Sequence, residues 1–189
     1  MADSIILFPS KSHIANKVGT VVTFNATNKT LVSSNTGTIA FTDFADGDII
    51  VVTGSTSNNA TFTVTGTPTA TTLTVLETVA TEAAGASVTV DHQGAYSAKQ
   101  KADGYYGYTD GLHTSAYHLN AYIGTVKIQA SLASTPTKDD WFDVDATTAT
   151  YASAETSNKG YNYTGNFVWI RAALTGMTAG SVTKVLYNY

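Results

Sequence analysis

Acidic side chains gather at two places in the sequence, and the first invites a metal-binding interpretation. Asp43, Asp46 and Asp48 lie within the segment TDFADGD, where carboxylates are close enough together to be considered as calcium ligands. The segment lacks the EF-hand ligand spacing and its closing glutamate. We therefore interpret it as a turn between two strands, where Asp and Gly supply the backbone geometry.

The second acidic cluster lies between residues 139 and 145. It consists of Asp139, Asp140, Asp143 and Asp145. Paired carboxylates are typical of glycosidases. On a strand, however, Asp143 and Asp145 alternate with Phe142 and Val144, which is the pattern of an ordinary solvated face. No nucleophile elbow, P-loop or dinucleotide fingerprint occurs either, so we predict no catalytic residue and no enzymatic activity.

The histidines do not form a metal site by spacing. His113 and His118 are five residues apart, so on a strand they point to opposite faces. His13 and His92 lie in other segments. The chain also has no cysteine, which excludes disulfides, thiolate ligands and a cysteine nucleophile. We predict neither a metal nor any other cofactor.

Two further features carry aromatic or cationic chemistry. Tyr105, Tyr106 and Tyr108 in the segment GYYGY form a candidate sugar-stacking surface, although we favour packing between modules or subunits, because aromatic residues are enriched at interfaces. Arg171 is the one arginine of the chain and lies in an apolar segment. We expect it to cross a sheet face and bind a carboxylate or carbonyl groups.

The residue composition favours strands. The chain has 33 threonines and 11 tyrosines among 189 residues, and both residue types fit a pleated, half-buried sheet. Short segments with period-two alternation are separated by turn residues about every ten positions. We predict an all-β protein in which helix is a minor element. The one helical piece we expect is a single turn within residues 132–140, where Pro136 prevents a longer helix.

The distribution of aromatic residues indicates two modules, because every tyrosine and both tryptophans lie from residue 96 onward. We expect two small β-sandwich or barrel modules with an extended N-terminal arm. The predicted segments are an arm and hairpin over 1–35, a small β module over 36–91, an ordered linker over 92–111 and a β-sandwich module over 112–189.

Alternation also predicts the core of each module. Ile49–Val52 is apolar on both faces, so it should be a central strand. The expected core residues are Phe62, Val64, Leu73 and Val75 in the first module, and Val126, Ile128, Phe167 and Trp169 in the second.

The N-terminal arm contains four adjacent large apolar residues. These are Ile5, Ile6, Leu7 and Phe8, and Pro9 follows them. An exposed patch of this kind is avoided by soluble monomers. We expect the patch to be buried against another subunit or a larger surface, or alternatively to fold back over Ile49–Val52.

Two partner classes are disfavoured by composition. No run of 18 apolar residues occurs, so we predict no membrane-spanning helix, and no signal-peptide core is recognisable. The formal charge is −4 and basic residues do not cluster, which argues against nucleic-acid binding.

Two long segments resemble modules of tailed-bacteriophage virion proteins. The first spans residues 38–90 and contains FADGDIIVVTGSTSNN, TFTV, LTV and EAAGASVTV. The second spans residues 104–189, and its marks are GYYGYTDGLHT, GTVKIQASLASTP, DWFDVD and GNFVWIRAALTGMTAGSVTKVLYNY. The second segment is similar to β-sandwich structural proteins of marine and cyanobacterial phages.

The resemblance implies a function without catalytic residues. It implies a structural component of a phage virion, assembled in the host cytoplasm, with the major capsid protein or tail proteins as partners. A capsid decoration or cement protein on the head surface is the first expectation. A tail, neck or fibre component, able to bind a receptor or glycan, is the alternative. The apolar arm leads us to expect a homo-oligomer, or a monomer that becomes ordered only on the particle, and the resemblance implies a trimer.

Overall fold

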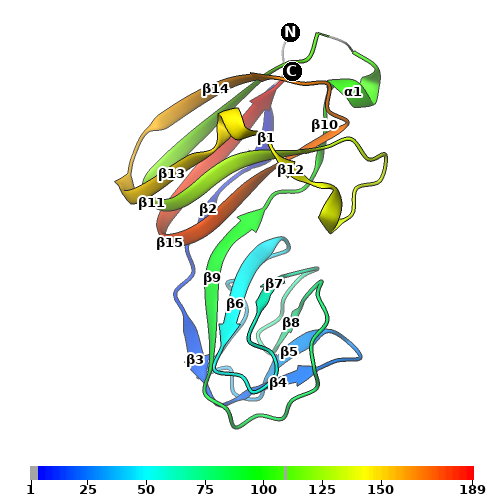
Figure 1. The fold of residues 1–189 in the computed structure, drawn as a ribbon. Helices are drawn as coiled ribbons and strands as arrows, with labels where there is room; N and C mark the ends of the chain where they lie inside the picture. The colour runs from blue at the N-terminus through cyan, green and yellow to red at the C-terminus, as the bar shows by residue number, and fades with distance from the viewer. Residues whose placement is uncertain (1–3, 109) are drawn as a thin grey trace. The chain divides into compact units, whose positions relative to one another are not determined.

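The structure is a computed structural model that describes residues 4–108 and 110–189 (Figure 1). Strands contain 54% of the residues and helices 5%, which confirms the predicted all-β fold. The chain divides into two compact units. Unit 1 contains the N-terminal residues up to His13 together with Tyr96–Tyr189, and unit 2 contains Ile14–Ala95.

Unit 2 is built from two small sheets. Its strands are β3 (Lys17–Gly19), β4 (Val22–Asn25), β5 (Thr30–Ser33), β6 (Asp48–Thr53), β7 (Thr61–Thr63), β8 (Thr72–Thr74) and β9 (Val88–Tyr96). One sheet has the order β3-β9-β6-β7 and the other β4-β5-β8, with every pairing antiparallel. A bridge between Val64 and Val75 connects the β7 end of one sheet with the β8 end of the other. The two sheets therefore enclose one core.

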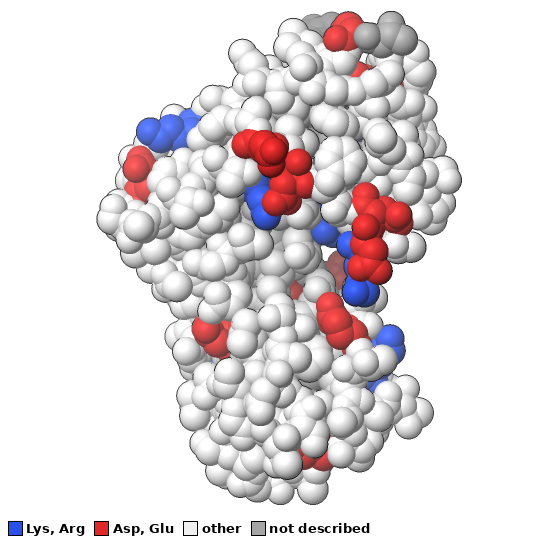
Figure 2. Space-filling model, in the orientation of Figure 1, with Lys and Arg blue, Asp and Glu red and all other residues white. Residues whose placement is uncertain are grey.

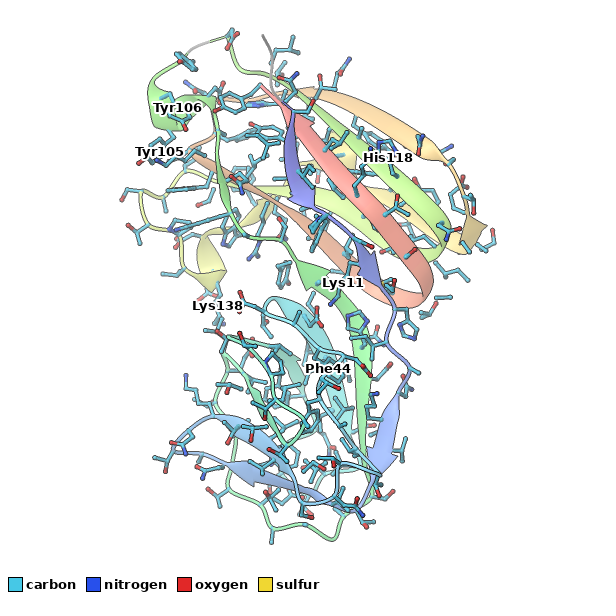
Figure 3. The ribbon with its side chains drawn as sticks, turned by 180° about the vertical axis from the view of Figure 1, so that it is seen from behind. Lys11, Phe44, Tyr105, Tyr106, His118 and Lys138 are labelled. Atoms are coloured by element: carbon cyan, nitrogen blue, oxygen red, sulfur yellow. The ribbon has the colours of Figure 1, made fainter. Side chains whose placement is uncertain are left out.

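The core of unit 2 is apolar and confirms the alternation read from the sequence. Phe62, Val64, Leu73 and Val75 are each at most 2% exposed, and all belong to one buried cluster. Strand β6 pairs with β7 on one side and β9 on the other, so Ile49–Val52 is a central strand as predicted. Phe44 closes the cluster and packs edge-on against His92, with ring centroids 6.3 Å apart (Figure 3).

Unit 1 contains two strands of 20 residues, and each shorter strand of the unit pairs with one of them. These are β11 (Leu112–Ser131) and β15 (Trp169–Asn188), which pair antiparallel along their length. The shorter strands are β1 (Ile5–Phe8), β2 (Lys11–Ser12), β10 (Gln100–Lys101), β12 (Phe142–Asp143), β13 (Ala149–Glu155) and β14 (Asn158–Thr164). The helical pieces are α1 (Asp103–Tyr106), η1 (Lys138–Asp140) and η2 (Asp145–Thr147). The single turn η1 confirms the short helical piece expected within residues 132–140, but α1 and η2 correct the expectation that it would be the one helical piece.

Both long strands bend sharply near their centres, so their halves lie in two layers (Figure 1). The pairing register shifts between Asn120 and Ile123, and Ala121 has a positive φ of 49°. On β15 the corner contains Gly176 and Gly180, with φ of 59° and 71°. A Cβ at Gly180 would lie 2.0 Å from the carbonyl oxygen of Ala121, so glycine is required where the two paired strands bend together.

At the corner, the alternating pattern of buried side chains on β11 shifts by one residue. Before it, His113, Ser115 and Tyr117 are buried, and after it Tyr122 and Val126 are buried, so the buried positions change from odd to even. An extra residue at a bulge changes which face a strand presents. The strand thereby keeps its apolar side toward the space between the two layers, which confirms the β-sandwich character of this unit.

The N-terminal segment is a strand of unit 1, which corrects the expectation of an extended arm. β1 pairs antiparallel with β15, with Ile5 opposite Tyr187 and Ile6 opposite Leu186. Leu7 and Phe8 are buried within the unit, at 5% and 7% exposure, while Ile6 is 53% exposed. The patch is covered because an unpaired edge of β15 offers backbone hydrogen bonds as well as apolar contact. Ile5–Phe8 belongs to unit 1, whereas Ile49–Val52 belongs to unit 2.

The segment boundaries also differ from those expected. The hairpin β4–β5, assigned to the segment 1–35, belongs to unit 2 with the strands of 36–91. Residues 92–111 are not a separate linker, because β9 extends to Tyr96 and β10 and α1, which follow it, belong to unit 1. Both assignments depend on pairing between strands that are far apart in the sequence, and the periodicity of a single segment does not predict its pairing partner.

Trp169 is a further correction, because it is only half-buried. The expected core residues Val126 and Ile128 are fully buried and Phe167 is 8% exposed, as predicted. Trp169 instead lies on the outer face of β15, opposite the buried Ile170. Its indole Nε1–H donates to the Ser134 carbonyl oxygen at 3.1 Å. The period-two pattern assigns Trp169 to the face opposite Ile170 correctly, but residue size does not decide which face is inside.

An exposed tyrosine surface on unit 1

A buried polar network holds α1 against the sandwich of unit 1. Asp103 and His113 are at most 1% exposed, and the Asp103 Oδ1 atom lies 3.3 Å from His113 Nε2. His113 Nε2 also lies 2.6 Å from the Gly165 carbonyl oxygen, and the Tyr187 hydroxyl lies 2.9 Å from His113 Nδ1. Both partners of Nε2 are hydrogen-bond acceptors, so this nitrogen carries a hydrogen and donates it to the Gly165 carbonyl oxygen.

Backbone hydrogen bonds fix the same segment. The Ala102 and Gly104 amides donate to the Val168 and Phe167 carbonyl oxygens, at 3.0 and 2.9 Å. A Cβ at Gly104 would lie 2.7 Å from the Phe167 carbonyl oxygen, so this position accepts only glycine without a shift. The GYYGY segment is therefore an ordered part of unit 1.

Three tyrosines form an exposed group above this base, which we name the tyrosine platform: Tyr106, Tyr108 and Tyr189. Their exposed fractions are 49%, 58% and 38%. The Tyr106 ring is nearly parallel to that of Tyr189, at 6° with centroids 6.1 Å apart, and stacks on Tyr108 at 5.9 Å. Burial, followed by a hydrogen bond with Tyr106, raises the pKa of Tyr189. These separations are typical of favourable aromatic pairs.

Lysines cover the neighbouring aromatic rings. The Lys101 Nζ atom lies 4.1 Å from the Tyr105 ring centroid, and Lys99 Nζ lies 4.4 Å from the Trp169 ring. Tyr105 connects the two groups, because its ring contacts both Tyr106 and Trp169 edge-on. Tyr105 and Tyr106 are side by side at the α1 end of the unit (Figure 3). Cation–π contact thus occupies the face of Tyr105 and Trp169.

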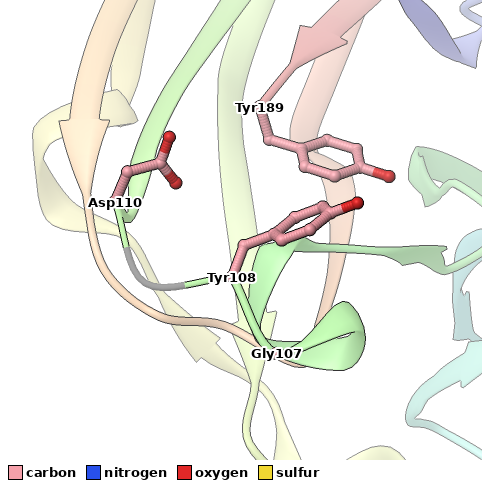
Figure 4. A pocket seen from close by; sticks show the side chains of 4 residues that line it. All are labelled: Gly107, Tyr108, Asp110 and Tyr189. Atoms are coloured by element: carbon pink, nitrogen blue, oxygen red, sulfur yellow. The ribbon is translucent and has the colours of Figure 1, made fainter.

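A pocket of about 520 Å³ opens beside the tyrosine platform (Figure 4). It is lined by Gly107, Tyr108, Asp110 and Tyr189. Gly107 ends α1 with φ of 75°, a left-handed conformation that turns the chain toward the pocket. Small-molecule sites have volumes of about 300–1,000 Å³, so the pocket has the size of a ligand site.

Arg171 lies between two aromatic rings on the outer face of β15. Its guanidinium carbon is 3.9 Å from the Tyr96 ring centroid and 4.3 Å from that of Trp141. Its Nε–H donates to the Gln129 side-chain oxygen at 2.9 Å, so a carboxamide takes the role expected of a carboxylate or carbonyl group. Burial lowers the pKa of Arg171 to about 10, and the group remains charged at neutral pH. Its contacts are those of a packing residue.

The acidic clusters have structural partners. Asp46 Oδ1 accepts from the Gly66 amide and Asp48 Oδ2 from the Ala45 amide, which agrees with the turn interpretation of this segment. Burial opposes ionisation of Asp143, but hydrogen bonds from Lys127 and Gln129 outweigh it and lower the pKa. Asp140 accepts from Thr137 in a capping box, and this lowers its pKa.

Glu82 forms a clasp that the sequence did not single out. Its carboxylate accepts hydrogen bonds from the Ser55 hydroxyl at 2.6 Å, the Thr56 and Ser57 amides, and the Asn58 side chain. The Ser55 bond, then the Thr56 amide, lowers the pKa of Glu82 to about 2 despite some burial. The carboxylate thus fixes the loop after β6.

The histidines agree with the spacing argument, because His113 is buried and His118 lies on the opposite, partly exposed face of β11. Among residues 4–108 and 110–189, no three His, Asp or Glu side chains are placed to share a metal ion. No helix in this described part is long and apolar enough to cross a membrane. On the face shown in Figure 2, acidic and basic side chains lie in small scattered groups.

The structure brings some of the expected interface residues together and separates others. Tyr105, Tyr106 and Tyr108 share one exposed surface, whereas Ile5–Phe8 is a strand within the sheet. Sequence reasoning missed Tyr189 and Asp110, which complete the pocket. No local spacing connects Tyr189 to GYYGY, because their proximity depends on the β11–β15 pairing. No family model, curated protein or solved structure matches this chain.

Proposed function

We propose that this chain is a non-enzymatic structural protein of a tailed-bacteriophage virion, displayed on the head surface as a decoration or cement protein. The observation that carries the proposal is the role of the residues that produce the phage resemblance. In both units these residues form turns, clasps and strand corners. If the residues that produce the resemblance stabilise the fold and none is arranged for catalysis, the chain fits a structural component of a particle better than an enzyme.

The first resemblance segment illustrates this role. Asp48 caps the turn before β6, and Glu82 clasps the loop that follows β6. Gly54, with φ of 79°, begins that loop, and a Cβ there would lie 2.1 Å from the Ser87 carbonyl oxygen. Each of these residues stabilises a particular backbone path.

The second segment behaves in the same way. Gly124, Gly176 and Gly180 have positive φ angles at the corners of β11 and β15. Gly104 begins GYYGY, and a Cβ there would lie 2.7 Å from the Phe167 carbonyl oxygen. The partners would be the major capsid protein and further copies of this chain, a trimer being the expected oligomer.

Purified virions test the proposal by location and copy number. Gold-labelled antibody against the recombinant chain should decorate the head, and quantitative mass spectrometry should count on the order of hundreds of copies, as a shell covered by a small domain requires. Absence of the chain from purified particles would contradict a virion role. A count of a few to tens, with label on the tail, would favour the second candidate.

The second candidate is a tail, neck or fibre component that binds a receptor or glycan. The exposed tyrosine platform and its pocket favour it, because aromatic side chains left in water at a fixed surface are typical of recognition sites. Particle location separates the two candidates, whereas ligand binding is measured on the isolated chain.

A further inference from the structure

The pocket beside the tyrosine platform has two walls with different chemistry. Tyr108 and Tyr189 supply aromatic rings, and Asp110 supplies a carboxylate on another side (Figure 4). A ligand seated between them would contact an apolar ring face and a hydrogen-bond acceptor at once. Sugars have this pair of properties, because a pyranose presents C–H groups on one face and hydroxyls around its rim.

Rings next to the pocket already have lysines over their faces. Lys101 and Lys99 lie over Tyr105 and Trp169, which removes those faces from competition for a ligand. Tyr108 is 58% exposed. The negative face of an aromatic ring attracts the weakly positive C–H groups of a sugar.

The charge of the pocket selects among ligands. Asp110 gives the lining a negative charge, and the described residues that line the pocket include no lysine or arginine. An anionic ligand such as a phosphate or sialic acid would therefore be repelled. A neutral sugar gains from the same carboxylate, because hydrogen bonds to charged groups are the stronger ones.

The base of the pocket is fixed before any ligand arrives. Asp103 accepts a hydrogen bond from the Tyr108 amide through its carbonyl oxygen at 3.0 Å and contacts buried His113 through its side chain. Tyr187, which binds His113, stacks on Tyr189 with ring centroids 5.4 Å apart. Both aromatic walls are thus tied to one buried network, and a preorganised wall loses little entropy on binding.

We propose that the Tyr108–Tyr189–Asp110 pocket binds a neutral glycan, with a sugar ring stacked on tyrosine and its hydroxyls donating to Asp110. This deepens the second candidate function and rests on the recognition role proposed there. The virion assignment is tested by particle labelling, so either idea can fail while the other holds.

The test uses the full chain on a glycan array that contains neutral and sialylated oligosaccharides. Soluble cello-, malto-, chito- and laminari-oligosaccharides at about 1 mM then test binding by NMR line broadening, in the range expected of a small ligand. We expect neutral glycans to bind and sialylated ones not to. Preference for sialylated glycans, or no signal with any neutral probe, would overturn the proposal.

Variants distinguish this pocket from adventitious binding. Tyr108→Ala should weaken binding about tenfold, whereas Tyr108→Phe keeps the ring and should remain within about twofold. Asp110→Asn keeps the shape and should weaken binding about fivefold. Phe142→Ala is the control, because Phe142 is an exposed aromatic of unit 1 outside the pocket. Equal affinity for Tyr108→Ala and the control would refute the site.

Discussion

Replacement of Gly180 by alanine should destabilise unit 1 far more than the same change at Gly176. Both glycines lie at the β15 corner with positive φ, at 71° and 59°. An L-residue in this region costs about 1–2 kcal/mol, and both variants share that cost. The difference lies in space: a Cβ at Gly176 would meet no atom within 4 Å, whereas one at Gly180 would lie 2.0 Å from the Ala121 carbonyl oxygen.

The overlap at Gly180 involves backbone, which cannot rotate away as a side chain can. Overpacking that forces backbone shifts costs about 1–3 kcal/mol in addition. We therefore expect a loss of unfolding free energy of about 1–2 kcal/mol for Gly176→Ala and about 2–5 kcal/mol for Gly180→Ala.

Urea denaturation followed by tryptophan fluorescence measures this difference in unit 1 alone. Both tryptophans, Trp141 and Trp169, belong to unit 1, so the signal does not report unit 2. A lower midpoint at unchanged denaturant slope would indicate lost stability of the folded state. If Gly180→Ala shifts the midpoint no further than Gly176→Ala, the close approach of Gly180 to the Ala121 carbonyl group is incorrect.

Three further predictions concern packing and pH. Phe167→Ala should cost unit 1 about 3–5 kcal/mol, and Trp169→Ala only about 1–2 kcal/mol because its ring is half-buried; tryptophan or tyrosine fluorescence in urea compares them, and equal losses would contradict the assigned faces. Phe8→Ala should cost about 3 kcal/mol and exposed Ile6→Ala less than about 1 kcal/mol in the same assay. Equally small losses for both variants would show that β1 does not pair with β15 in solution. Glu82 has a pKa lowered to about 2, so its contribution to unit 2 is complete above its ordinary pKa of 4.5 and is lost as pH falls toward 2. Glu82→Gln should flatten this acid dependence in denaturation followed by circular dichroism, and an unchanged dependence would show that the clasp does not form.

Much of the local structure could be predicted from the sequence. Alternation identified Phe62, Val64, Leu73 and Val75 as core, and Ile49–Val52 as a central strand. These predictions succeed because successive side chains on a strand point to opposite faces, so burial leaves a period of two in the residues themselves.

Only part of the candidate site could be predicted from the sequence. GYYGY drew attention to Tyr105, Tyr106 and Tyr108 because glycine and tyrosine occur together there, and the structure does expose these rings. Asp103 and His113, which hold the segment, gave no signal, since neither a lone Asp nor a lone His indicates its partner.

Local chemistry in the sequence by itself determined the strand segments, their buried faces and the turn residues. On β11 the buried positions change from odd to even around Asn120, but the sequence does not mark this break, because the buried His113 and Ser115 are polar. Only the tertiary structure decided that this break is a corner within one strand, that Ile5–Phe8 pairs with β15, and that Tyr189 lies beside Tyr106. The physical reason is that strand pairing joins residues far apart in the chain, and its partner is chosen by backbone hydrogen bonds that every residue can offer.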